Sequence, residues 1–596
     1  MKLKHLRITN CNRVSDIDIE IRGNLVLIGP NGSGKSTVLH CLDMLLGMDN
    51  LQLLRILTEK YIRDESQPMT VETVFGDLEN DELTTFSDAD DVQNGNDLRV
   101  RLDARFDDGS ISITRSFSGN ATPKKLSKTQ IEAFGWTLLR AESNVRDIWF
   151  EQESIAEEEK RKINLGDGKA ALGINLGDGE AALGIDLGDG KAALGIDLGD
   201  GKAALGNDLG AEAAPGTNPG GAETTSATSL IPNEEAFSKT AKHVSSMLPN
   251  AEALETMGQE LARKLSQTLP FVFGKDDPKL PPEATGSNDL ANSVQQKIRD
   301  DGLLQLVNEQ SDGMRAFFTM VLYDLLRKGT NILAIDEPEA HLHPSSQRSL
   351  AKMLKAGDGQ KILVTHSPTI AGSFEPEEIV VIRSDGSAVQ PKEGFLRGDS
   401  GMFARWWIGR QLEPLTAGAV IAVEGPSDRI IVDRVATVLG FDLDRNDVVL
   451  VETNGCGDMK VVEAIFGDGG FGIPLYELID KDAQDDVARR LKVNPSGLEA
   501  RNIFVSVKDL EDEYVQAIGA RKLWDRLKET STFSKNVFAL CKVEADGYPT
   551  EADLAEFIRG KSNRKIPSAL VAAGLIDSTN ALSMGSVTRL LKAASS

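Results

Sequence analysis

The chain has 596 residues, which is too long for a single hydrophobic core, so we expect two or more domains. Hydrophobic residues make up 40% and aromatic residues 5%, an ordinary composition for a soluble protein, and the formal net charge is −25. This charge excludes a surface coated in basic residues for binding polyanions, although it leaves room for a local basic groove. Clustered acidic residues can also hold divalent cations.

The four cysteines, Cys11, Cys41, Cys456 and Cys541, are scattered and form no CxxC pair. They therefore predict neither a disulfide framework nor a zinc site, and they favour a reducing cytoplasm. The N-terminal "MKLKHLRITN" lacks the apolar core of a signal peptide, and no run of about 18 apolar residues predicts a transmembrane helix. We expect a cytoplasmic protein with no membrane partner.

Alternating apolar residues predict strands in "LKHLRITN", "DIDIEI" and "NLVLIG", and the last of these leads into a glycine-rich turn and a helix. Strand patterns return in "DLRVRLDARF" and "SISITRSF". We expect an α/β fold with one domain in two parts, interrupted by an insertion, and then a linker around 395–415 and a second α/β unit with C-terminal helices. The predicted bounds are 1–150 and 296–395 for the first domain, 151–295 for the insertion and 415–596 for the second unit.

The insertion begins with a tandem repeat of 11 residues, of the type INLGDGKAALG, over residues 163–210, and helical patterns follow it. Three glycines in each unit would cost a helix roughly 3 kcal/mol relative to alanine, and Gly-Asp-Gly favours a turn. We expect an exposed spacer of variable length, followed by a helical dimerisation segment. A small calcium-binding solenoid like the RTX repeats is the alternative, although those repeats have another period and a denser Gly/Asp pattern.

The segment "LVLIGPNGSGKST" contains the pattern G-x-x-x-x-G-K-[ST] from Gly29 to Ser36, between a predicted strand and a predicted helix. In this context backbone N–H groups face the phosphates of a nucleotide, Lys35 reaches the β and γ phosphates, and Ser36 holds Mg²⁺. The pattern therefore predicts an ATP site. Its predicted nucleotide-binding residues are Asn31, Gly32, Gly34, Lys35, Ser36 and Thr37.

A second part of this site is predicted in "NILAIDEPEAHLHP", where an apolar strand ends in Asp336 and Glu337. Two carboxylates directly after a buried strand are costly unless a cation lies there. Asp336 would bind the Mg²⁺ shell, and Glu337 would orient or deprotonate the attacking water. In "ILVTHSP", His366 follows another strand and is placed to sense the γ-phosphate.

These motifs in this order resemble the ABC-type ATPase heads of recombination and chromosome-maintenance proteins, over residues 1–150 and about 296–385. In those families a long insertion splits the head, and ATP binds between two copies, so the resemblance implies at least a homodimer. It also implies a signature serine that faces the partner's phosphates, which is Ser311 in "NEQSDGMRAFF". Only Ser311 and Gly313 fit the usual LSGGQ-like loop well. Gln67 in "DESQPMTVE" is the expected Q-loop glutamine.

Acidic residues also recur in the second α/β unit, where "AGAVIAVEGPSDRIIVDRVATVLG" and the segments after it alternate strands with helices. The pattern predicts a parallel sheet, with carboxylates where strands end and helices begin. Converging carboxylates require cations, and oxygen ligands suit Mg²⁺ or Mn²⁺; two such ions are the usual arrangement for attack on a phosphodiester. The predicted metal-binding residues are Glu424, Asp428, Asp480, Asp482 and Glu511.

This acidic pattern resembles the Toprim domain of topoisomerases and primases. An ABC head followed by a Toprim domain is similar to the overcoming-lysogenization-defect (OLD) nuclease family, which includes the nuclease subunit of the Gabija antiphage system and nucleases paired with some retrons. The resemblance leaves residues 151–295 unaccounted for. It implies that the five acids bind metal, with Glu424 also catalytic and Glu513 a looser match. It further implies a catalytic lysine near the C-terminus, for which Lys565 is the first choice and Lys561 the second.

We therefore predict an ATPase and a Mg²⁺- or Mn²⁺-dependent DNA endonuclease or nickase that acts in antiphage defence as a homodimer or tetramer. The resemblance extends the expected partners to a helicase or to a retron reverse transcriptase with its msDNA. A structural ATPase that clamps DNA, with a Toprim fold that binds without cutting, is the alternative. A primase-like polymerase is disfavoured because the chain has no primase zinc motif or priming domain.

Overall fold

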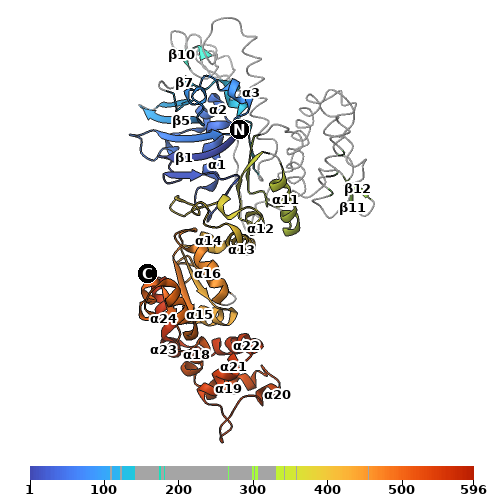
Figure 1. Ribbon diagram of the computed structural model, residues 1–596, viewed down its shortest axis with the longest axis vertical. Helices are drawn as coiled ribbons and strands as arrows, with labels where there is room; N and C mark the ends of the chain where they lie inside the picture. The colour runs from blue at the N-terminus through green and yellow to red at the C-terminus, as the bar shows by residue number, and fades with distance from the viewer. Residues whose placement is uncertain are drawn as a thin grey trace, which may run out of the picture. The chain divides into compact units, whose positions relative to one another are not determined.

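The computed structural model describes residues 1–107, 110–120, 124–140, 331–340, 342–357, 359–453 and 456–595, with short stretches between 174 and 305 (Figure 1). The chain forms two compact units. The first comprises Met1–Ala141, Arg263–Val272 and Ser311–Ser596, and the second comprises Glu142–Ala262 and Phe273–Gln310. The predicted signature loop at Ser311–Gly313 and most of the 163–210 repeat lie outside the described residues.

In the second unit, two short antiparallel strand pairs are described. Within the repeat, β9 (Ile174–Asn175) pairs with β10 (Glu180–Ala181). Near the end of the unit, β11 (Ile298–Asp300) pairs with β12 (Leu303–Gln305).

The first unit begins with an antiparallel sheet whose strands alternate between buried and exposed side chains. Such alternation arises when one face of a sheet covers a core and the other meets solvent. Helices α2 (Asn50–Ile56), α3 (Asn80–Thr85) and α4 (Asp90–Gln93) lie between its strands in the chain, and α5 (Lys128–Ala133) follows its last strand. In order across the sheet, the strands are β2 (Ile17–Glu20), β1 (Lys2–Thr9), β4 (Met69–Gly76), β5 (Leu98–Asp107), β6 (Ser110–Phe117) and β7 (Lys124–Lys125).

A second, mostly parallel sheet joins the two parts of the predicted ATPase head. β13 (Ile332–Asp336) pairs in parallel with β8 (Trp136–Arg140), although the two strands are separated by the whole insertion. This pairing confirms the head split by an insertion. The remaining strands are β14 (Gln360–Val364), β3 (Leu25–Ile28), β15 (Ile379–Ile382) and the antiparallel edge strand β16 (Ala388–Val389), and the order is β16-β15-β3-β14-β13-β8.

The strands of this second sheet are buried, as expected for a parallel sheet covered by helices. Helix α1 (Lys35–Leu46) follows β3 and contacts β8, β13 and β14. Helix α11 (Pro344–Ala356) follows β13, and the short helix α12 (Pro368–Ala371) follows β14. Consequently the segments that follow β3, β13 and β14 meet at one edge of the sheet, because all three strands run in the same direction.

The segment expected as a linker is helical in large part. It forms α13 (Gly398–Ile408) and α14 (Glu413–Thr416), because residues such as Trp407 and Leu415 are buried. The Trp407 ring packs edge-on against Phe466, with 5.3 Å between ring centroids. These helices contact elements on both sides of them in the chain, α12 and β15 before them and β18 and α16 after them.

The C-terminal part contains a four-stranded parallel sheet, as predicted, with the order β18-β17-β19-β20. The strands of this sheet are β17 (Ala419–Val423), β18 (Val448–Glu452), β19 (Leu475–Ile479) and β20 (Ile503–Val505), and the helices between them are α15 (Pro426–Leu439), α16 (Cys456–Phe466) and α17 (Gln484–Leu491).

Among the helices that the structure describes, none is long and apolar enough to cross a membrane.

A group of C-terminal helices continues the core of this sheet and is coloured red in Figure 1. Helix α18 packs against α21 and α22, and α22 packs against α15. These helices are α18 (Leu510–Ile518), α19 (Ala520–Glu529), α20 (Lys535–Phe538), α21 (Glu551–Arg559), α22 (Ser562–Ala573), α23 (Ser578–Ser583) and α24 (Gly585–Ala594).

Candidate active sites

In the glycine-rich loop between β3 and α1, two positions have a backbone conformation and close neighbours that require glycine. Gly29 and Gly34 have φ values of 155° and 105°. A Cβ atom at Gly29 would lie 2.1 Å from the carbonyl oxygen of Ile382, and one at Gly34 would lie 2.5 Å from Cγ1 of Val14. These glycines therefore let the loop lie close to its neighbours and wrap around the start of α1.

Lys35 and Ser36 open helix α1 and lie where a nucleotide's phosphates would bind. The Lys35 ammonium is buried and donates hydrogen bonds to the carbonyl oxygens of Gly29 (3.0 Å) and Pro30 (2.9 Å). Burial lowers the pKa of Lys35, and nearby carboxylates, among them Glu337, oppose this shift. The Ser36 hydroxyl donates to Oδ1 of Asp336 at 3.3 Å, which joins the first half of the predicted site to the second.

Glu337 directly follows β13 and has a left-handed backbone, with a φ of 52°. Such a conformation is strained in a residue other than glycine, and strained residues tend to cluster at functional sites. Its N–H donates to the carbonyl of Val364 at 2.9 Å, and its Oε1 lies 3.9 Å from Nε2 of His366. Burial and the positive charge of Lys35 lower the pKa of His366. The structure therefore brings Lys35, Ser36, Asp336, Glu337 and His366 together at one sheet edge.

Glu339 is a residue of this site that the sequence analysis did not select, although it belongs to the same "DEPEAHLHP" segment. Its carboxylate accepts hydrogen bonds from the Thr365 hydroxyl (2.7 Å) and from the backbone N–H groups of His366 (2.5 Å) and Ser367 (3.1 Å). Burial raises the pKa of Glu339. Glu339 thus fixes the loop that presents His366.

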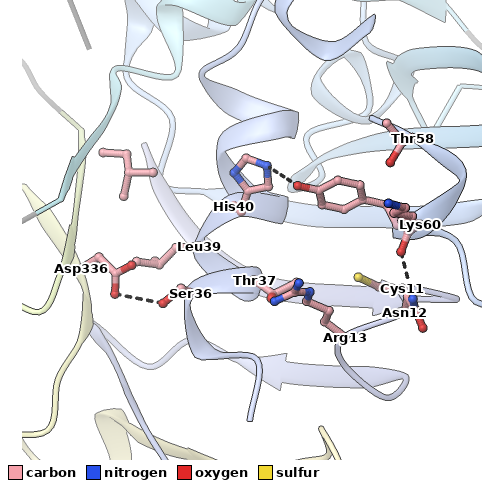
Figure 2. A pocket seen from close by; sticks show the side chains of 12 residues that line it. Cys11, Asn12, Arg13, Ser36, Thr37, Leu39, His40, Thr58, Lys60 and Asp336 are labelled. Atoms are coloured by element: carbon pink, nitrogen blue, oxygen red, sulfur yellow. Dashed lines mark hydrogen bonds between the residues drawn. The ribbon is translucent and has the colours of Figure 1, made fainter. Parts of the chain in front are cut away.

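A cavity of about 640 Å³ adjoins Ser36 and Asp336, and Figure 2 shows the side chains around it. Its size is within the usual range for small-molecule sites. His40 Nε2 and the Tyr61 hydroxyl lie 3.3 Å apart on one side of it, and the Asn12 side chain donates to the carbonyl of Lys60 at 2.9 Å. The lining residues are Cys11, Asn12, Arg13, Ser36, Thr37, Leu39, His40, Thr58, Lys60, Tyr61, Leu138 and Asp336.

Three further residues predicted for the nucleotide site differ in their position relative to this cavity. Thr37 lines it, whereas Asn31 is exposed on the glycine-rich loop. Gln67 is exposed in the loop before β4, is not one of the lining residues, and accepts a hydrogen bond at its carbonyl from Asn10 Nδ2 at 2.8 Å. No motif in the sequence marks the lining residues His40 and Tyr61, which are close only because α1 and the segment before β4 pack together.

The second acidic site lies at the carboxyl edge of the C-terminal parallel sheet. Glu424 follows β17, Asp480 follows β19, and Asp428 lies in the first turn of α15. Burial and the carboxylates of Glu424 and Asp428 raise the pKa of Asp480 to about 8. Burial and the carboxylate of Glu511 raise the pKa of Asp428 to about 7. Because β17 and β19 pair in parallel and the four carboxylates influence one another's pKa, four of the five predicted metal-binding acids lie near one another at this edge of the sheet.

Lys565, on α22, reaches the same acidic cluster. Its Nζ lies 3.1 Å from Oε1 of Glu511, a residue that is only 1% exposed. Burial alone would lower the pKa of Lys565, but the carboxylates of Glu511 and Asp428 outweigh it and raise this pKa. The structure therefore places the first-choice lysine against the acids, whereas Lys561 is exposed just before α22.

Two of the predicted acids are in different surroundings from these four. Asp482 is exposed in a 3-10 helix, Lys481–Ala483, that follows β19. Glu513 is buried, and its two carboxylate oxygens accept backbone N–H groups from Val507 (3.0 Å) and Ser586 (3.4 Å). Glu513 therefore joins the loop before α18 to the start of α24.

Asp509 and Arg559 belong to this region and were missed by the sequence analysis. Asp509 caps α18 by accepting the N–H of Asp512 at 2.8 Å, and Nε of Arg559 lies 2.8 Å from its Oδ2. Arg559 also pairs with the buried carboxylate of Asp512. Burial raises the pKa of Asp509 to about 6. The dense acids of "KDLEDE" indicate such a cluster, but nothing in the sequence pairs it with Arg559.

The donor set of the acidic cluster fits a hard divalent cation. Glu424, Asp428, Asp480 and Glu511 offer only oxygen ligands, and Oε1 of buried Glu511 has no hydrogen bond of good geometry despite its proximity to Lys565. Among the residues that the structure describes, no group of three or more histidine, cysteine or acidic side chains already has the arrangement of a metal centre. The carboxylates would therefore have to draw closer around an ion.

The fold and the two sites define a P-loop ATPase joined to a Toprim domain, and comparisons with known families agree. Residues 1–168 match the family described as an AAA ATPase domain. Residues 219–372 match the family described as an AAA domain, putative AbiEii toxin, Type IV TA system. Residues 415–482 match the TOPRIM domain of overcoming lysogenization defect protein-like proteins.

Individual relatives point to the same family. The chain is 27% identical to the OLD nuclease of Thermus scotoductus over 256 residues, which cover 39% of this chain and 48% of that protein. It is 26% identical to the endonuclease GajA of Bacillus cereus over 166 residues, which cover 26% of this chain and 29% of that protein. The chain thus spans less than half the length of these relatives.

Among solved structures, the C-terminal region of the Burkholderia pseudomallei OLD protein is similar at 19% identity and a TM-score of 0.24, covering 30% of this chain and 96% of that one. The family matches and the sequence relatives confirm the predicted resemblance to OLD-family nucleases, because the match to an ATPase domain is followed along the chain by the match to the OLD-like TOPRIM domain.

Proposed function

We propose that the chain is an ATP-regulated, metal-dependent DNA endonuclease or nickase of the OLD type that acts in antiphage defence. The observation that carries this proposal is the cluster of Glu424, Asp428, Asp480 and Glu511 at one sheet edge, with Lys565 paired to Glu511. We would not expect clustered carboxylates in a site that only bound DNA, because carboxylates repel phosphates. The names of the nuclease relatives support the same conclusion.

In this proposal, the four clustered acids would hold Mg²⁺, or Mn²⁺ in its place, and the ion would supply activation of water and neutralisation of charge on the phosphodiester. Asp428 and Asp480 would have to lose their protons to act as ligands, because their raised pKa values leave them partly protonated near neutral pH. Lys565 stabilises negative charge on the phosphate, for which its position against Glu511 is suited. Glu424 is proposed both as a ligand of the ion and as a catalytic residue.

The ATPase head works in a separate step. Lys35 would leave the carbonyls of Gly29 and Pro30 to bind the phosphates of ATP, and Ser36 with Asp336 would hold Mg²⁺. Glu337 would orient or deprotonate the attacking water, and His366 would contact the γ-phosphate. The adjoining cavity between His40 and Asp336 would take the nucleoside. We expect a homodimer or tetramer in which Ser311 of one copy faces the ATP of another.

The test is a plasmid-nicking assay with Mg²⁺ or Mn²⁺ in the absence of ATP, combined with ATP-binding measurements. Asp480→Ala should abolish cleavage and leave ATP binding intact, because it removes a metal ligand of the Toprim site only. Lys35→Ala should weaken ATP binding while the Toprim site still binds metal. Cleavage by Asp480→Ala at the wild-type rate would disprove the nuclease assignment. Tight DNA binding without any cleavage by the wild-type protein would favour a DNA clamp.

A further inference from the structure

We propose that Lys481, Lys508 and Lys561 form a lysine rim that binds DNA backbone phosphates beside the one to be cut. This inference rests on the proposed function, and it specifies how the same site holds its substrate. The rim consists of exposed side chains on three segments that adjoin residues of the acidic cluster in the chain. Lys481 follows Asp480, Lys508 lies just before α18, which carries Glu511, and Lys561 lies just before α22, which carries Lys565. None of the three lysines belongs to the cluster of Glu424, Asp428, Asp480, Glu511 and Lys565.

Lys481 begins the 3-10 helix after β19, and its backbone adjoins the loop that carries Lys508. The backbone N–H of Lys481 donates to the carbonyl of Lys508 at 2.9 Å. Each lysine is next to an acid in the chain, because Lys481 follows the half-buried Asp480 and Lys508 precedes the buried Asp509. The side chain of Lys508 is 60% exposed. Phosphates next to the scissile one would therefore pass within reach of both ammonium groups.

Lys561 reaches the same region from the C-terminal helices. It lies two residues after Arg559, whose Nε is 2.8 Å from Oδ2 of Asp509, the residue that follows Lys508. It also immediately precedes α22, the helix that places Lys565 against Glu511. Figure 1 shows α18, α21 and α22 close together in the C-terminal part, as their packing contacts require. The exposed lysine selected as second choice for catalysis is thus better placed to bind a flanking phosphate.

The rim keeps positive charge available for a ligand. Lys481 donates to the neutral side chain of Gln484. Lys508 lies 3.5 Å from Asp512, but that carboxylate is already paired with Arg559. Lys561 is exposed and forms no ion pair within the described part of the chain. Since the exposed Asp482 follows Lys481 directly, we expect Lys508 and Lys561 to contribute more than Lys481.

The negative charge of the protein explains why DNA binding would require such a rim. The chain has a net charge of −25, and the acidic cluster itself repels DNA until cations bind. Phosphate binding by lysine releases counterions, so each contact adds affinity that falls as salt rises. A few lysines around the cleavage site can therefore hold DNA of any sequence on a protein that is otherwise strongly acidic.

The test compares Lys508→Ala, Lys561→Ala and the double variant with Lys535→Ala, a matched control at an exposed lysine on α20. Each variant is made in full-length Asp480→Ala protein, so that DNA is not cut, and the Kd for a short duplex is measured across a salt series. We expect each rim variant to weaken binding roughly tenfold at low salt and to lower the slope of log K against log salt by about 0.9. Lysine-to-arginine changes should restore both values, because they keep the charge.

In cleavage-competent protein, the rim variants should raise KM and leave kcat nearly unchanged, because they remove binding that substrate and transition state share. Unchanged affinity and salt slope in the double variant would overturn the inference, as would an equal loss in Lys535→Ala. A loss that arginine does not restore would also overturn it, since it would mean a structural role. Failure of the nuclease proposal is seen separately, as absence of cleavage by wild-type protein, while the binding series still decides whether the rim holds DNA.

Discussion

At the scale of single residues, we expect the protonation of Asp480 to couple pH to the proposed metal binding. The pKa of Asp480 is raised to about 8, so between about pH 4 and pH 8 the folded, metal-free protein holds a proton that the unfolded chain has released. The free energy of unfolding of the metal-free protein therefore falls as pH rises through this window. If Mg²⁺ binds Asp480 as proposed, it would have to displace the same proton, so we expect its stabilising effect to grow over the same range.

We predict that Asp480→Asn makes the metal-free protein more stable than wild type at pH 8 to 9, by about 1 to 3 kcal/mol, because it removes a buried charge without removing the side chain. The same change should abolish most of the Mg²⁺-dependent rise in the midpoint of thermal unfolding. Thermal unfolding of the full chain with and without Mg²⁺, from pH 6 to 9, tests this. A Mg²⁺ effect that stays constant with pH in wild type would contradict the assigned proton release.

Glu337 offers a second test at this scale. Glu337→Gln keeps the size of the side chain and removes the base, so ATP should still bind while hydrolysis slows by about 10²- to 10⁴-fold. Phosphate release measured beside nucleotide affinity checks the prediction. A parallel loss of binding and hydrolysis would instead mean that Glu337, with its left-handed backbone, is needed to maintain the site.

At the scale of elements, the loop between β14 and α12 depends on Glu339. The Glu339 carboxylate accepts one hydroxyl and two backbone N–H groups from Thr365, His366 and Ser367. Glu339→Ala would leave these donors without a partner, at a cost of about 1 to 3 kcal/mol for each buried group, and would release His366. We expect slower ATP hydrolysis with ATP binding largely kept.

Glu339→Gln is the matched control, because its amide oxygen can still accept the backbone N–H groups. It should hydrolyse ATP much faster than Glu339→Ala, whereas Glu337→Gln should be slow. Comparing the ATPase rates of the three variants separates a residue that positions the loop from one that acts on water. Equal losses in both Glu339 variants would show that the negative charge of Glu339 matters, beyond its hydrogen bonds.

At the scale of the whole molecule, the insertion separates two parts of one ATPase sheet, since β8 and β13 pair across it. The repeat within it has nearly identical units, as expected of a duplicated segment under little packing constraint. We predict that deleting Ile174–Gly195, two whole units, leaves the oligomeric state, ATP hydrolysis and cleavage nearly unchanged, because loop length costs only about 0.6 kcal/mol per doubling. Light scattering and the two activity assays test this. Loss of the oligomer or of nicking would make the repeat part of the working assembly.

The residues of the two sites could be predicted from the sequence to different extents. The segment from Gly29 to Ser36 is contiguous, and its glycines and lysine act through local backbone geometry, so the sequence alone identifies it. Asp336 and Glu337 were found because a strand of buried residues ends at them. Alternation of strands and helices was likewise enough to predict the parallel Toprim sheet and the edge at which Glu424 and Asp480 lie.

Only the tertiary structure decided which of the remaining residues meet. Lys565 and Lys561 are four residues apart, yet packing of α22 against α18 directs only Lys565 to Glu511. Asp482 and Glu513 match a pattern of acids, but one is exposed and the other is engaged by backbone N–H groups. The pairing of Arg559 with Asp509, and the nearness of Lys481 to Lys508, join segments that are distant in the chain. Sequence spacing specifies which face of an element a residue occupies, but the packing of elements fixes which faces come together.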